Sequence, residues 1–195
     1  MMNQIKGTFI ITLLLIFSHY SYASQKPSFT NTYQMLIDDK GNISLPENFN
    51  KNWVFLGAWS VAQQDKGDKG AAALHNVYTQ PDTVEYFQKN KKFPDGAILI
   101  KELFKNTTKT MTTGMVSFAN EVEGWFVMVK DSKSRFKNNP LWGDGWGWVL
   151  FNATDKTKTV TTNYKIDCIG CHIPAKNNDW IYTEGYPILF ENKMH

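Results

Sequence analysis

The sequence of 195 residues predicts an α+β fold in which an antiparallel β-sheet of about five or six strands dominates and a few helices flank it. Two observations support this prediction. Most apolar residues fall in short runs rich in aromatic and β-branched side chains, and polar turns separate these runs. Only one segment has a clear helical pattern, and the turn after it leads straight into the next run.

Six segments have the composition of strands: residues 53–59, 74–78, 97–104, 112–118, 124–130 and 145–151. The one clear helix begins at Pro81, has Val84 and Phe87 in its apolar stripe, and ends at a turn over residues 93–96. A second, short helical stretch is predicted over residues 132–136.

The segment 97–104 contains one charged residue on each face of its strand. Alternation places Lys101 on the face of Leu99, and Glu102 on the face of Ile100. Both faces are otherwise apolar, so whichever face is buried contains a charge that is costly to desolvate without a partner. Lys101 either extends to solvent at the strand end or points into a pocket.

The N-terminus resembles a secretory signal. One positive charge in residues 1–6 precedes an apolar run over residues 7–17, and small residues at 21–23 suit a cleavage site. The run is too short to span a bilayer comfortably, so a retained anchor is the less favoured alternative. We predict that residues 1–23 are cleaved, and that residues 24–195 form a single periplasmic domain without a membrane anchor.

The charge balance identifies no partner. The chain has 21 basic and 18 acidic residues, and Arg135 is its only arginine. Arginine is the residue best suited to reading phosphate groups, so its scarcity argues against a nucleic-acid partner.

The pentapeptide Cys168-Ile169-Gly170-Cys171-His172 has the pattern by which c-type haem is attached. Two thiols three positions apart can reach the two vinyl groups of one porphyrin, and the next histidine can lie under the iron. We therefore predict one haem c, attached covalently through Cys168 and Cys171 and ligated by His172. Because bacterial c-type haem is attached after export, the motif agrees with the signal peptide.

Three alternatives fit the pentapeptide less well. A zinc site needs four ligands, and outside the motif the chain offers only His19, His75, His195 and carboxylates. A thioredoxin-like dithiol follows an early strand of a parallel sheet, whereas this motif lies near the C-terminus. A plain disulfide is the third. The late position in a β-rich chain also differs from small helical cytochromes c and from four-helix cytochromes c'.

A larger set of residues resembles the cytochrome P-460 family. Residues 93–103 read Phe-Pro-Asp-Gly-Ala-Ile-Leu-Ile-Lys-Glu-Leu, and the haem motif and then Tyr-Pro-Ile-Leu at 186–189 follow much later. The similarity extends from about Asn42 to Leu189. The haem motif together with the Asp-Gly-x-x-x-x-Lys-Glu-Leu strand is far more specific than the motif alone.

The resemblance implies a mostly antiparallel β-fold around one c-type haem with five-coordinate iron. In the members that oxidise hydroxylamine, a lysine is joined covalently to the porphyrin, and Lys101 falls on that residue of the motif. The related cytochromes c'-beta bind gases without this cross-link, and aromatic side chains cover their open iron face. We expect hydroxylamine oxidation, with nitric oxide or carbon monoxide binding without turnover as the alternative.

Oxidation of hydroxylamine requires a group that removes protons. Asp167 is one candidate, because active members often have Glu at about this position; a surface carboxylate is the alternative. His75 is another, although some relatives have arginine near there and an ordinary strand histidine would explain it. The predicted catalytic residues are thus Lys101, Asp167 and His75.

A simple electron carrier is the third functional hypothesis, and it requires a sixth iron ligand. The candidates are Met35, Met111, Met115, Met128, His75, Met194 and His195, although methionines in strands usually fill cores. The Trp-Gly-rich segment 142–148 either lines the haem or forms a tight turn. A small periplasmic redox partner and a homodimer complete the expected interactions.

Overall fold

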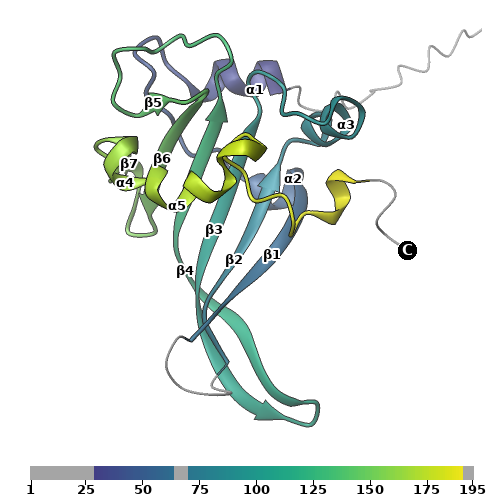
Figure 1. Ribbon diagram of the computed structural model, residues 1–195. Coiled ribbons are helices and arrows are strands. Elements are labelled where there is room, and N and C mark those ends of the chain that lie inside the picture. Colours follow the sequence, from purple (N-terminus) through teal and green to yellow (C-terminus); the bar gives the residue numbers. More distant parts are fainter. Residues whose placement is uncertain (1–28, 64–69, 191–195) are drawn as a thin grey trace, which may run out of the picture.

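The computed structural model describes residues 29–63 and 70–190. Within these residues, seven strands form one antiparallel sheet in the order β1-β2-β3-β4-β6-β5, and β7 pairs with β6 (Figure 1). The predicted α+β fold with a dominant antiparallel sheet is confirmed. The predicted signal peptide, residues 1–23, lies outside the described residues.

The strands are β1 (Val54–Ala62), β2 (Ala71–Thr79), β3 (Ile98–Met111), β4 (Gly114–Lys130), β5 (Trp142–Gly143), β6 (Trp146–Asn152) and β7 (Asp155–Thr159). The segments 112–118 and 124–130 were expected as two strands, but residues 114–130 form the single strand β4 and residues 112–113 form a turn. Register shifts near Phe104 interrupt the alternation of β3 and β4, which explains why the sequence pattern breaks there. The strands β3 and β4 form a long hairpin, and the end of this hairpin projects beyond the rest of the sheet (Figure 1).

The helices are α1 (Phe29–Leu36), α2 (Phe49–Asn52), α3 (Pro81–Asn90), α4 (Tyr164–Asp167) and α5 (Ile169–His172), with 3-10 helices η1 (Ile173–Asn178) and η2 (Pro187–Leu189). The predicted helix is α3, which has Pro81 in its first turn and buries Val84 and Phe87. Lys91 ends it in the left-handed conformation.

The helical stretch predicted over residues 132–136 is wrong, because these residues form turns. The Asp95 carboxylate accepts the backbone N–H of Ser132, and the Asp131 carboxylate accepts that of Arg135. Ser134 has a left-handed φ of 52°. Side-chain acceptors that take backbone donors in this way compete with helix formation.

The two faces of the sheet bury separate cores. On the first face, side chains of the sheet pack against α3 and the C-terminal segment 164–190; the sheet contributes Leu99, Met128, Trp146 and Trp148. On the second face, sheet residues pack against the region of α1 and α2 and the loop before β5; they include Ile98, Ile100, Val127, Val129 and Val149. This division follows from the period of two along each strand.

The C-terminal segment crosses the first face, where Figure 1 shows α5 and η1 in front of the strands. Cys168, Ile181 and Leu189 are buried there. A side chain at Gly57 of β1 would overlap the backbone carbonyl oxygen of Gly185, so this glycine permits the close approach of the segment. No helix among the described residues is long and apolar enough to cross a membrane.

Gly57→Ala is expected to lower the free energy of unfolding by about 1–3 kcal/mol, because the added methyl group must displace the segment at Gly185. Denaturant unfolding measures the change. Ala58→Ser is the matched control, since it adds one atom at the neighbouring exposed position. Equal unfolding midpoints for the two variants would contradict the close approach.

Candidate functional site

A cavity of about 340 Å³ lies between the first face of the sheet and the C-terminal segment. This volume is within the range of roughly 300–1,000 Å³ that is usual for ligand and cofactor pockets. Most of its lining is apolar or aromatic: Trp59, His75, Val77, Leu99, Lys101, Phe126, Val127, Met128, Trp148, Val149, Asp167, Cys168, Cys171, His172, Ile181, Tyr182 and Tyr186. The cavity brings together every site residue that the sequence predicts.

Both cysteines of the pentapeptide border this cavity as free thiols. Cys168, between α4 and α5, is buried, and Cys171 is exposed. Burial raises the pKa of the Cys168 thiol to about 11, so this thiol is protonated at neutral pH. The structure has no disulfide between them, and the described ranges contain no group of three or more His, Cys, Asp or Glu residues suited to a metal ion.

His172 is half-buried, and its ring is oriented by one hydrogen bond. The Nδ1 atom lies 2.6 Å from the backbone carbonyl oxygen of Trp180. Because a carbonyl oxygen can only accept, Nδ1 carries the proton, and the lone pair of Nε2 is left for a metal. The ring of Trp148 contacts the imidazole edge-on, with centroids 5.0 Å apart. Burial lowers the pKa of His172, which favours the neutral imidazole that a ligand must be.

Lys101 lies near the start of β3 and points into the cavity. Its Nζ atom lies 4.5 Å from the centre of the Phe126 ring on the neighbouring strand. Burial lowers the pKa of the Lys101 amine and so favours its neutral, nucleophilic form. Glu102 lies on the opposite face with 5% exposure, and its carboxylate accepts a hydrogen bond of 3.1 Å from the Trp125 indole.

His75 of β2 borders the same cavity. Its ring is stacked with that of Trp59, with centroids 6.3 Å apart. Burial, with a smaller contribution from the nearby Lys101 charge, lowers the pKa of His75 to about 4. The imidazole is therefore neutral at pH 7.

Asp167 ends α4 at the rim of the cavity, and its carboxylate is fully exposed. Its Oδ2 atom accepts hydrogen bonds from the backbone N–H groups of Thr162 and Asn163, at 2.8 and 3.1 Å, and from the Thr162 hydroxyl at 3.2 Å. These bonds lower the pKa of Asp167, with the largest contribution from the Thr162 N–H. A role in proton removal stays a prediction.

Only two of the proposed sixth ligands, Met128 and His75, border the cavity. Met35, Met111 and Met115 have exposed side chains, and residues 194 and 195 lie outside the described part of the chain. In the Trp-Gly segment, Asp144 and Gly145 both have positive φ, as a two-residue turn between antiparallel strands requires. Of its three tryptophans, Trp148 borders the cavity.

Some lining residues carried no signal in the sequence. Tyr182 follows the motif in an irregular segment, and its hydroxyl donates to the Cys171 carbonyl oxygen at 2.7 Å. The Trp180 carbonyl is a backbone group in a left-handed residue. Neither a hydrophobic period nor a motif spacing identifies contacts of this kind.

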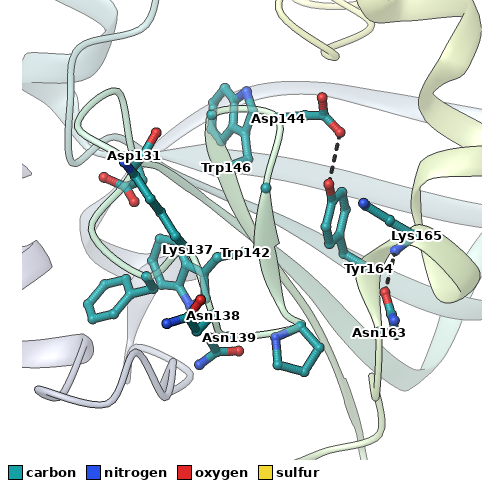
Figure 2. Close-up of a pocket in the computed structure, with 15 residues that line it drawn as sticks. Asp131, Lys137, Asn138, Asn139, Trp142, Asp144, Trp146, Asn163, Tyr164 and Lys165 are labelled. Atoms are coloured by element: carbon teal, nitrogen blue, oxygen red, sulfur yellow. Dashed lines mark hydrogen bonds between the residues drawn. The ribbon is translucent and has the colours of Figure 1, made fainter.

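A second pocket, of about 410 Å³, lies beside the β5–β6 turn and is more open. Figure 2 shows its polar rim, including Lys137, Asn138 and Lys165, and the hydrogen bond from the Tyr164 hydroxyl to Asp144. Tyr164 is stacked on Trp148, which separates this pocket from the cavity at His172. It contains none of the predicted site residues.

The depressed pKa of His75 predicts a pH dependence of stability. The unfolded histidine, with a pKa of 6.5, binds a proton that the folded one binds only near pH 4. As the pH falls from 6.5 to about 4, the unfolded state therefore binds a proton that the folded state does not bind. This proton binding stabilises the unfolded state relative to the folded state. The free energy of unfolding should increase from about pH 4 to 6.5 and then level off.

His75→Gln should remove this contribution, while the similar one from His172 remains. Unfolding free energies of both proteins, measured at several pH values, give the difference. If the free energy of unfolding changes equally with pH in wild type and His75→Gln between pH 4 and 6.5, the burial of His75 is contradicted.

Comparison with known proteins agrees with the resemblance in the motifs. Residues 46–183, more than half of the chain, match the family model described as Cytochrome P460. The search of curated proteins found no match to the chain. The matched range includes β1 to α5 and therefore the cavity, Lys101 and the pentapeptide. The chain belongs to the cytochrome P460 family, whose members are haem cytochromes.

Proposed function

We propose that this protein is a periplasmic monohaem c-type cytochrome that oxidises hydroxylamine or a similar small nitrogen compound at an open iron position. The main observation that supports the proposal is that Lys101 and the Cys-x-x-Cys-His pentapeptide line the same largely apolar cavity. Family membership implies the haem; the covalent attachment and the reaction are inferred from the residues.

The residues of the cavity fit a haem. Cys168 and Cys171 both border the space and would form the two thioether links. His172 would ligate the iron through Nε2, because its Nδ1 atom is engaged by Trp180.

Lys101 supports the enzymatic version of the proposal. Its amine is held inside the cavity by the strands on either side, where Val77 and Phe126 are its cross-strand partners. A buried amine with a lowered pKa is more readily neutral than a surface lysine, and only a neutral amine can form a bond to carbon. The lowered pKa therefore supports Lys101 as the lysine that would be joined to the porphyrin.

When bound, the haem supplies an open iron position and accepts the electrons of the reaction. The chain must hold the substrate there and take up protons. Asp167 is ionised at neutral pH and lies at the rim, so it is our candidate for the proton acceptor. His75 borders the cavity as a neutral imidazole, so it is the second candidate for the proton acceptor.

The aromatic lining favours a second candidate function, the binding of nitric oxide or carbon monoxide without turnover. Trp59, Phe126 and Tyr186 border the cavity, and an apolar pocket that excludes water is all that gas binding requires. Simple electron transfer is a third candidate, in which Met128 or His75 would be the sixth ligand.

The surroundings of the motif are compatible with a small redox partner. Ile166 and Ile173, on either side of the pentapeptide, are 79% and 58% exposed. Apolar side chains of this size are suited to brief contact with another protein. The signal-like pattern in residues 1–23 supports a periplasmic location, and a homodimer remains an expectation.

Asp167→Asn tests the proposed reaction. The asparagine oxygen can still accept the backbone N–H groups at Thr162 and Asn163, but it cannot take a proton. We expect ferric holoprotein mixed with hydroxylamine and an electron acceptor to turn over in wild type, and turnover in the variant to fall by about 10²–10⁴-fold. Stopped-flow absorbance measures both binding and turnover.

Asp155→Asn is the matched control, because Asp155 is also a fully exposed carboxylate that accepts hydrogen bonds from a nearby residue, the backbone N–H and hydroxyl of Thr157. It should turn over as wild type does. Wild-type turnover in Asp167→Asn would contradict the role of Asp167. Hydroxylamine binding without turnover in the wild type itself would contradict the enzymatic function and favour gas binding.

A further inference from the structure

The carbonyl group that holds His172 belongs to an unusual stretch of backbone. Asp179 and Trp180 are consecutive residues with left-handed φ angles of 54° and 67°. Residues with a Cβ atom rarely adopt this conformation, and two in succession require support from the surrounding structure. The orientation of the Trp180 carbonyl therefore depends on what holds Asp179 in place.

Two residues at one end of the sheet provide this support. The Nζ atom of Lys130, on β4, lies 2.5 Å from Oδ1 of Asp179, and the Lys130 side chain is only 12% exposed. The Trp146 indole, on β6, donates to the Asp179 carbonyl oxygen at 3.0 Å and to Oδ1 at 3.3 Å.

Lys130 and Trp146 are cross-strand partners, and the Lys130 ammonium lies 4.8 Å from the centre of the Trp146 ring. The two residues thus act together on Asp179 from neighbouring strands. Of these two residues only Lys130 is charged, so its removal breaks the ion pair with Asp179 while the hydrogen bonds from the Trp146 indole can remain.

Hydrogen bonds on either side of Trp180 fix the rest of the turn. The Trp180 N–H donates to the Ala175 carbonyl oxygen at 2.9 Å. The Asn178 side chain donates to the Ile181 carbonyl oxygen and to the Thr183 hydroxyl, both at 2.7 Å. The Trp180 carbonyl between these anchored residues points at Nδ1 of His172, and the ion pair at Asp179 fixes the preceding peptide.

We propose that Lys130 and Asp179 are positioning residues that set the strength of the hydrogen bond from His172 Nδ1 to the Trp180 carbonyl, and through it the basicity of the iron ligand. This inference rests on the proposed ligation of iron by His172. A stronger bond at Nδ1 gives the imidazole more anionic character, which strengthens the iron–histidine bond and favours ferric iron.

Resonance Raman spectra of the ferrous holoprotein report the iron–histidine stretching frequency directly. Lys130→Met and Asp179→Asn should both lower this frequency relative to wild type, and both should raise the reduction potential. Lys130→Arg keeps the ion pair and should restore values near wild type. Asparagine tolerates left-handed backbone, so Asp179→Asn tests the inference even if Lys130→Met fails to fold.

Glu121→Gln is the control, because it breaks an ion pair with Lys105 in the far part of the same hairpin; its frequency and potential should equal those of wild type. An unchanged frequency in both Lys130→Met and Asp179→Asn would overturn the inference. Absence of an iron–histidine band from the wild type would instead contradict a five-coordinate iron ligated by His172, so the two failures are distinguishable.

Discussion

The alternation of side chains along β3 and β4 is the constraint on which the rest of the structure depends. Successive residues of these central strands serve two separate cores. One core is filled by aliphatic and aromatic side chains of the sheet, the N-terminal segment and the loop before β5. The other leaves a cavity, because the C-terminal segment covers its face with short helices and aromatic rings. A shift of one residue in the register would exchange the two faces and move Lys101 out of the cavity.

The C-terminal segment depends on the sheet for its shape. The helices α4 and α5 have four residues each, and helices of this length do not persist alone in water. Tight contacts hold the segment instead: Gly57 admits the backbone at Gly185, and the turn at Asp179 is tied to the end of β4. The geometry of the pentapeptide is therefore a property of the whole domain rather than of its own residues.

Much of this could be predicted from the sequence, because periodicity and motif spacing are local signals. The strands β1, β2 and β6 and the helix α3 were predicted to within a few residues, whereas β3 continues to Met111 and β4 is one strand where two were expected. The resemblance to the family rested on the strand that contains Lys101. The short helix expected at residues 132–136 failed because Asp95, some 40 residues away, takes part in folding that turn. The same limit applies to the Trp180 carbonyl, because no local pattern connects it with Lys130 and Trp146, which hold the preceding residue Asp179.

The most direct test of the account is the alkaline pyridine haemochrome spectrum of the denatured holoprotein. We predict that the wild type lacks the ordinary c-type spectrum because Lys101 is joined to the porphyrin, and that Lys101→Ala restores that spectrum. Lys105→Ala, an exposed lysine on the same strand, should behave as wild type. An ordinary c-type spectrum in the wild type would contradict the enzymatic cofactor and leave a gas-binding or electron-carrying haem.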